Sequence, residues 1–234
     1  MAADSRCAVH LRASIAGLLW LAAGEEVLLL EQAPDDEPGD PYCWSAPATV
    51  AHISELRGQQ ATRLRCVREG IAPPVYPQVD HTALEVYAAF AETRRAKAFE
   101  LSRASASALL DELHATADHD LLDPAPEPWL RGRQLWLEIV VRGFWHPLDH
   151  ISEYYRSHWQ AERGLALHRH AVETARYLGA ARPARGMAHY GLACAWAACG
   201  EQAAALSEFD HALNLNPDLR HAAARDADLR PLRI

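Results

Sequence analysis

Residues Arg133–Tyr155 read RQLWLEIVVRGFWHPLDHISEYY, a long apolar stretch that carries His146 and, four residues later, His150. Apolar residues recur in it at helical spacing, which predicts one helix facing a hydrophobic core. They are Leu135, Ile139, Val140, Phe144, Leu148 and Ile151. Because residues i and i+4 lie on one face of a helix, both imidazoles would project from the same side and supply two ligands of a metal site.

The spacing of the two histidines is weak evidence by itself. With 13 His in 234 residues, about 0.7 such pairs are expected by chance. Pro147 also lies between them, where it removes a helix hydrogen bond and presses on the carbonyl of Gly143. Gly143 would ease the resulting kink, but a sharp kink would separate the two imidazoles and weaken the metal hypothesis.

The composition favours an all-α protein. Half of the residues are hydrophobic, Ala and Leu dominate, and β-branched residues are sparse. The net charge of −8 argues against non-specific binding of nucleic acid, which needs a basic surface. The five cysteines are odd in number and form no CxxC motif, so neither a disulfide framework nor a cysteine zinc site is indicated. A reducing cytoplasm fits this pattern best.

The apolar run Ile15–Gly24 is the one segment that resembles a signal peptide or membrane span. Asp4 occupies the region that a signal peptide keeps basic, and no clear A-x-A cleavage site follows. Glu25 and Glu26 end the run before it reaches the ~20 apolar residues that a transmembrane helix needs. We therefore expect a cytoplasmic protein that does not associate with a membrane.

Proline-rich linkers divide residues 1–158 into four helical regions. The first contains Leu11–Leu30 and ends before Pro34, the second runs from an N-cap at Ser45 to about Glu69, the third spans about Thr82–His114 with a break near Phe90, and the fourth is Arg133–Tyr155. The linkers are Gly70–Gln78, with three prolines, and Asp118–Trp129. Four long helices with such connections predict an antiparallel four-helix bundle.

Residues 159–234 form a second region, in which small residues multiply and Ala161–Gly179 and Ala184–Pro217 read as helical hairpins. Residues 184–217 resemble one tetratricopeptide repeat. The matching residues are Leu192, Ala193, Trp196, Gly200, Ala205, Phe209, Ala212 and Pro217. One repeat cannot bury its own apolar face, so we expect this tail to dock on the bundle through Trp196 and Phe209. A structural cap is the favoured role, and peptide binding is the alternative.

Two motifs together resemble the DinB-like superfamily of metal-binding four-helix bundles. The first is WSAPATVAHISEL, in which Trp44-Ser45 opens a helix that carries His52, and the second is Trp145-His146-x-x-x-His150-Ile151. The resemblance covers residues 8–158 and implies that His52, His146 and His150 bind one divalent metal. It also implies activities like those of mycothiol-dependent maleylpyruvate isomerase and the bacillithiol transferases.

Three imidazole donors would leave a coordination position open for water or substrate, as in catalytic metal sites. This donor set suits zinc, nickel or iron(II). Glu153 continues the stripe of His146 and His150, and Glu55 lies one turn from His52, so both are candidate catalytic carboxylates that would act as a base or orient a ligand. Glu153 could equally be a fourth ligand or a solvated helix residue.

Two functions fit these observations. The first is a metal-dependent enzyme that acts on a small electrophile, with a low-molecular-weight thiol or metal-bound water as nucleophile. The second is a non-catalytic module that sequesters a small molecule or engages a protein through its repeat-like tail. The expected partners are a small-molecule substrate and a second copy of the chain in a homodimer.

Overall fold

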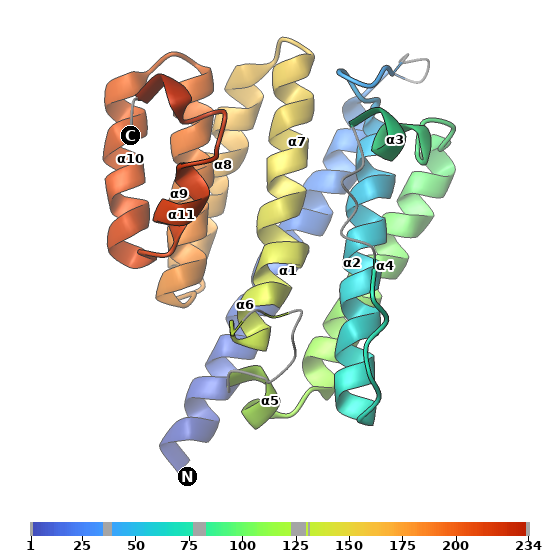
Figure 1. Cartoon of the computed structure of the whole chain (residues 1–234), viewed down its shortest axis with the longest axis vertical. Coiled ribbons are helices and arrows are strands. Elements are labelled where there is room, and N and C mark those ends of the chain that lie inside the picture. Colours follow the sequence, from blue (N-terminus) through green and yellow to red (C-terminus); the bar gives the residue numbers. More distant parts are fainter. Residues whose placement is uncertain (1, 35–38, 77–82, 123–129, 131, 233–234) are drawn as a thin grey trace. The chain divides into compact units, whose positions relative to one another are not determined.

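A computed structural model of the chain describes residues 2–34, 39–76, 83–122, 130 and 132–232. The protein is all-α and 78% helical, and no strand occurs among the described residues (Figure 1). This confirms the predicted class. The chain divides into two compact units, Met1–Tyr154 and Tyr155–Ile234, which are described separately.

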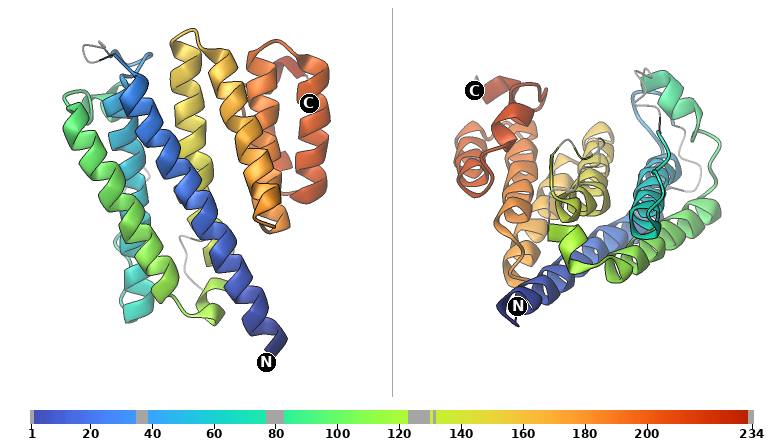
Figure 2. Two further views of the ribbon diagram at one scale, coloured as in Figure 1. Left: turned by 180° about the vertical axis from the view of Figure 1, so that it is seen from behind. Right: turned by 60° about the horizontal axis from the view of Figure 1, so that its bottom comes forward.

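The first unit consists of long helices that pack side by side. Its elements are α1 (Ala2–Gln32), α2 (Ala46–Glu69), α3 (Ala83–Ala88), α4 (Arg95–Ala115), α5 (Asp118–Leu122), α6 (Leu135–Val140), the π-helix η2 (Val141–Trp145) and α7 (His146–Ser157). Helices α2 and α4 form an antiparallel pair, and α1 packs against α4 (Figure 2). The antiparallel pairing is thus as predicted.

The predicted helix ends agree closely with the structure. Ser45 is the N-cap of α2, and its Oγ accepts a hydrogen bond from the Ala48 amide at 3.4 Å. The third helical region is interrupted between α3 and α4, as expected near Phe90. The predicted linker Asp118–Trp129 is partly wrong, because its first five residues form α5, while residues 123–129 lie outside the described part.

A buried ion pair ties three helices of the first unit together. Glu26 of α1 is fully buried and accepts a hydrogen bond from the Nη2 of Arg57 on α2, which is also buried. Its second oxygen accepts a bond from the Ser102 hydroxyl of α4 at 2.6 Å. Isolated charges at such positions would be strongly unfavourable, so the three side chains fix how α1, α2 and α4 face one another.

Residues Ala8–Gln32 of α1 are long and apolar enough to cross a membrane by length and composition, although 44% of their most apolar window is buried in the protein. The buried face includes Leu18, Leu30 and the paired Glu26. A core helix, a signal sequence and an anchor all meet this criterion. Cytoplasmic location therefore stays a prediction.

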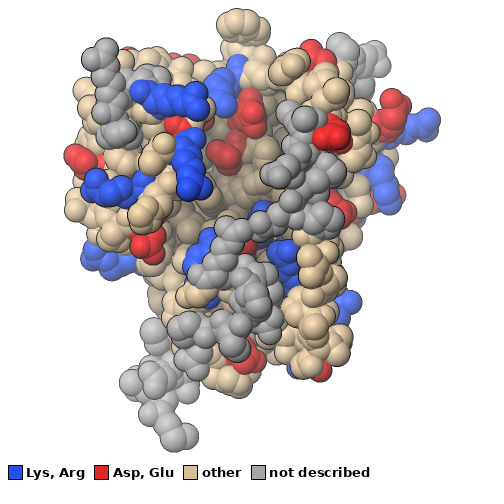
Figure 3. Space-filling view, in the orientation of Figure 1, with Lys and Arg blue, Asp and Glu red and all other residues tan. Residues whose placement is uncertain are grey.

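Charged side chains of both signs are mixed over the face shown in Figure 3, and no broad basic area gathers there among the described residues. The whole chain carries a formal charge of −8. Phosphate backbones are bound by clustered Lys and Arg side chains. This face thus offers no observation in favour of nucleic acid binding, and the exclusion of nucleic acid stays a prediction.

The π-helix η2 joins α6 to α7 and packs against α1. A Cβ atom on Gly143 would overlap the Leu19 side chain of α1 and lie 2.8 Å from Leu109 Cδ2 of α4. Only glycine therefore fits at this crossing. The expected role of Gly143 in easing a kink at Pro147 is secondary to this close approach.

The second unit is a set of helical hairpins. Its elements are α8 (Ala161–Tyr177), α9 (Arg182–Ala198), α10 (Gln202–Leu215), α11 (Leu219–Ala223) and the 3-10 turn η3 (Arg230–Leu232). Helices α9 and α10 pair antiparallel across Gly200, whose φ of +82° favours glycine. Trp196 packs on the cluster of Leu165, Leu192 and Ala195. The ring centroids of Phe209 and Tyr190 lie 6.1 Å apart. Repeat identity and docking on the first unit stay predictions.

The close approach at Gly143 generates a prediction. Gly143→Ala should lower the free energy of unfolding by about 1–3 kcal/mol, because the new methyl group must displace packed leucines. Gly58→Ala is the matched control, since a Cβ there meets nothing within 4 Å and should stabilise helix α2 by up to about 1 kcal/mol. Urea unfolding of the three proteins measures both effects, and equal stabilities would contradict the packing described.

The buried ion pair generates a second prediction. Glu26→Leu should destabilise the protein by about 3–5 kcal/mol, because it leaves the Arg57 guanidinium buried without its carboxylate. The double variant Glu26→Leu with Arg57→Met should recover most of that loss, since no charge then remains in the core. Urea unfolding again provides the measurement. A double variant as unstable as the single one would show that the charges themselves are not the source of the effect.

Candidate metal centre

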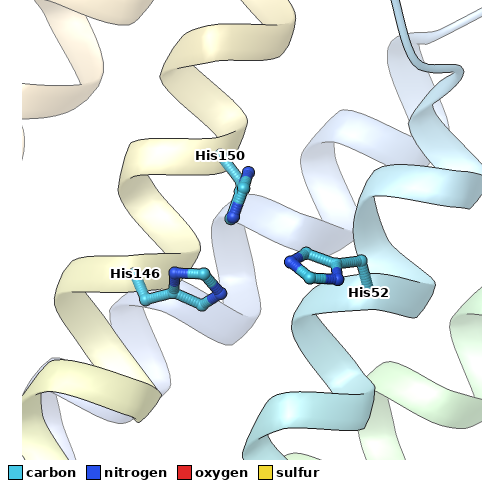
Figure 4. Close-up of side chains that lie close together, drawn as sticks. All are labelled: His52, His146 and His150. Atoms are coloured by element: carbon cyan, nitrogen blue, oxygen red, sulfur yellow. The ribbon is translucent and has the colours of Figure 1, made fainter. Parts of the chain in front are cut away.

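Three histidines predicted to act together lie together in the first unit. His52 projects from α2, and His146 and His150 project from α7 toward it (Figure 4). One ring nitrogen from each lies within 4.8 Å of the others. The ring centroid of His52 lies 5.6 Å from that of His146 and 4.8 Å from that of His150. The centroids of His146 and His150 are 4.4 Å apart.

The π-helix explains why Pro147 does not separate the two histidines of α7. In η2 the His146 amide bonds to the Val141 carbonyl, five residues earlier rather than four. The widened turn accommodates the chain before a proline that has no amide hydrogen to donate. Helix α7 then continues regularly to Ser157, so His146 and His150 remain one turn apart on one face.

The surroundings of His52 and His146 favour the neutral forms of these two rings. Burial lowers the pKa of His52 to about 3, and the charges of His150 and Arg142 act in the same direction while Glu153 opposes them. Burial also lowers the pKa of His146 well below its usual value, with further contributions from His150 and His52. Neutral imidazole is the form that binds a metal ion.

His146 carries an unsatisfied nitrogen. Its Nε2 is closed to solvent and has no hydrogen-bond partner among the described residues. Buried polar atoms are nearly always paired, so each exception calls for an explanation. A metal ion bound by the three imidazoles would satisfy this atom, and His150, with its side chain 23% exposed, would leave the site accessible from outside.

The two predicted carboxylates differ in position. Glu153 is exposed, and its Oε2 lies 3.4 Å from His150 Nδ1, one turn along α7. Glu55 is exposed on α2 and accepts a hydrogen bond from Gln59 Nε2 at 3.0 Å. The structure therefore brings Glu153 to the histidines, whereas the contact it shows for Glu55 is with its own helix.

Aromatic side chains beside the histidines were not predicted as part of the site. Trp44 contacts His52 and His150, Phe90 contacts His52, and Tyr87 packs on Trp44; together we call these three residues the aromatic wall. Trp44 belongs to the motif that opens α2 and carries His52, and this shared motif is the signal in the sequence that could have placed Trp44 near the site. Tyr87 and Phe90 lie in and after α3, and no spacing connects them to His52.

Two other clusters of ionisable groups occur in the second unit. In the first, the rings of His189 and His211 stack with their centroids 5.6 Å apart, and His189 Nδ1 lies 2.7 Å from Glu208 Oε2. Ligand atoms of Cys194, Asp226 and Asp228 also lie within 4.8 Å of one another.

Structural contacts already occupy the carboxylates of this second cluster. Asp226 accepts a hydrogen bond from the Tyr190 hydroxyl, and Asp228 pairs with Arg156, both at 2.7 Å. Their geometry is therefore explained without a metal. The three-histidine cluster, which contains an unsatisfied buried nitrogen, is the stronger candidate.

Comparisons with protein-family models, curated proteins and solved structures find no match to this chain. The resemblance to the DinB-like superfamily therefore rests on the motif residues and their arrangement. What is established is an all-helical protein whose helices form antiparallel pairs.

The lowered pKa values predict how the metal-free protein responds to acid. His52 titrates near 3 when folded and near 6.5 when unfolded, so protons bind the unfolded chain preferentially as pH falls between those values. The contribution of His52 to the free energy of unfolding should thus be fully present above about pH 6.5 and should decline as the pH falls below that value. At pH 4.5 the loss from His52 should be about 1–2 kcal/mol once solvent screening is allowed for.

Thermal unfolding from pH 7 to pH 4.5 tests this dependence. The His52→Asn variant should lose less stability over that range than the wild type, because it lacks the group that must remain unprotonated. His114→Asn changes an exposed histidine and should follow the wild type. Parallel curves for the wild type and His52→Asn would show that burial does not perturb this imidazole.

Proposed function

We propose that the chain is a metal-dependent enzyme acting on a small electrophilic molecule, with a DinB-like four-helix bundle in its first unit. The observation that carries this proposal is the convergence of His52, His146 and His150, whose ring nitrogens lie within 4.8 Å of one another. His146 and His150 lie one turn apart on α7, and His52 precedes them by about ninety residues on α2, so helix packing is what brings His52 to the pair.

The donor set fits a divalent transition metal. Three imidazole nitrogens suit zinc, nickel or iron(II), and ligand type alone does not choose among these. Two of the three imidazoles are held neutral by burial, and the Nε2 of His146 lacks a protein partner. Three protein ligands would leave room for substrate or water, as in other catalytic sites.

A metal bound there would supply Lewis acidity, which acidifies water or holds a low-molecular-weight thiol as its thiolate. The chain itself would supply Glu153. A hydrogen bond from His150 Nδ1 to Glu153 would orient the ring and leave Nε2 for the metal. Because its carboxylate is also exposed, Glu153 is our candidate base for accepting a proton from the nucleophile.

Glu55 is a weaker candidate for catalysis than the sequence indicated. Its carboxylate accepts a hydrogen bond from Gln59 on the exposed side of α2. We therefore assign the proton-accepting role to Glu153. Transfer, isomerisation and hydrolysis all fit one open metal position, since a fold does not specify a reaction.

A cavity in the second unit favours the alternative function of a binding module. Its volume is about 320 Å³, and it is lined by Arg176, Arg185, His189 and one carboxylate, Glu173, together with apolar Val172 and Leu215. Among the described residues neither arginine forms an ion pair, in a chain with an excess of acidic groups. Unpaired guanidinium groups in a cavity suit an anionic ligand.

Metal retention tests the enzyme proposal. Purified wild-type protein, incubated with zinc, nickel or iron(II) and then freed of loosely bound ions, should retain close to one metal per chain. His52→Ala, His146→Ala and His150→Ala should each lose most of it, because two imidazoles without a third hold a divalent ion poorly. Elemental analysis gives the stoichiometry.

Two variants control for general effects of removing a histidine. His114→Ala and His189→Ala change residues far from the site in sequence and should leave metal content unchanged. Glu153→Gln should retain the metal but lower turnover, since it keeps the side-chain shape and removes the base. Wild-type protein that retains none of the three metals would favour the binding module instead.

A further inference from the structure

The aromatic wall stands directly against the three-histidine site. The Trp44 ring lies 5.4 Å from His52, edge to face, and 6.5 Å from His150 with the two planes only 14° apart. The Phe90 ring lies 5.4 Å from His52, and Tyr87 lies 5.5 Å from Trp44. Trp44 and Phe90 thus border the histidines, and Tyr87 packs against Trp44.

Local hydrogen bonds hold Trp44 in place. Asp40 Oδ1 accepts bonds from the amides of Tyr42 and Cys43, at 2.7 and 2.9 Å, which closes a turn just before it. The indole Nε1 donates to the Pro41 carbonyl at 3.1 Å. Ser45, the next residue, caps α2. The ring is therefore preorganised by the loop rather than by a ligand.

Gly39 leaves room for the Tyr87 hydroxyl. A Cβ atom on Gly39 would lie 2.7 Å from the Tyr87 hydroxyl oxygen and 2.8 Å from the Ser45 amide nitrogen, so a side chain there would disturb the wall. Burial, together with the charges of Asp40 and Glu92, raises the pKa of Tyr87. The phenol thus stays neutral and offers a flat, uncharged surface.

The exposure of these rings distinguishes them from core packing. Trp44, Tyr87 and Phe90 are each half-buried, whereas Phe144 of the neighbouring core is 1% exposed. Several large apolar side chains left partly open to solvent at one place are more informative about binding than one exposed residue. A rigid, partly open aromatic surface beside a candidate reaction centre provides a stacking platform for a ligand.

We infer that the aromatic wall makes the three-histidine site selective for molecules that carry a flat aromatic or conjugated group next to their metal-binding atoms. This inference rests on the proposed metal function and names the substrate class of that site. Stacking on Trp44 contributes beyond the burial of apolar area, so a flat ring binds more tightly than a saturated ring of similar size. The expected preference is about two- to tenfold.

Hydroxamates test the inference, because their metal-binding group is the same throughout and the cyclohexane and benzene compounds are matched in size. The probes are acetohydroxamate, cyclohexanecarbohydroxamate and benzohydroxamate, titrated calorimetrically into zinc-loaded protein. Benzohydroxamate should bind about two- to tenfold more tightly than the cyclohexane compound. In Trp44→Leu this ratio should fall to about one, while acetohydroxamate binding changes little.

Two further variants separate stacking from folding. Trp44→Tyr keeps an aromatic ring and should retain part of the preference, whereas loss of structure would abolish binding of all three probes. Trp20→Leu removes a tryptophan that is 64% exposed on α1 and should leave the ratio unchanged. Thermal unfolding and zinc content are measured for each variant, so that only folded, loaded protein is compared.

The outcomes distinguish this inference from the function on which it rests. Retained zinc with a ratio that is unchanged in Trp44→Leu overturns the selectivity and leaves the metal function standing. Wild-type protein that binds neither zinc nor any hydroxamate overturns both. A preference that disappears in Trp44→Leu, persists in Trp20→Leu and partly returns in Trp44→Tyr supports the stacking platform.

Discussion

The buried pair of Glu26 and Arg57 constrains the first unit more than any apolar contact does. Leucine and alanine surfaces can slide past each other with modest changes in free energy, whereas a buried carboxylate and guanidinium must meet. Ser102 adds a third helix to the same interaction. Because Arg57 lies five residues after His52, fixing its direction also fixes the face of α2 on which His52 lies.

The segment that consists of α6, η2 and α7 meets a second constraint at Pro147. An ordinary α-helix would leave a carbonyl without a donor there, and the chain instead forms the five-residue π-turn η2. Gly143 lets this wider turn approach Leu19 and Leu109. Turns of this kind are frequent at functional sites, where they redirect side chains. Here the turn ends directly at His146.

Most of the helices could be predicted from the sequence because the signals that start and end a helix are local. Apolar periodicity, the N-cap at Ser45 and the proline-rich linkers act within a few residues, so both ends of α2 and the C-terminal ends of α1 and α4 could be predicted. The pairing of Glu26 with Arg57 and the position of Tyr87 could not, since both depend on how distant helices face each other. The pairing of His146 and His150 followed from their spacing, whereas the addition of His52 was accessible only through the resemblance of the two motifs.

The three-histidine cluster contributes unfavourably to the stability of the fold. Burial, together with the nearby charge of Arg142, disfavours protonation of His146. It also leaves the Nε2 of His146 without a partner among the described residues. A protein gains nothing in stability from such an arrangement, because hydrophobic residues of similar volume would pack there without polar groups to satisfy. The same features, neutral nitrogen donors held rigidly and close together, are what a metal ion requires. The cost is therefore most simply explained by ligand binding, and the aromatic wall stands at the side of the cluster where that ligand would be recognised.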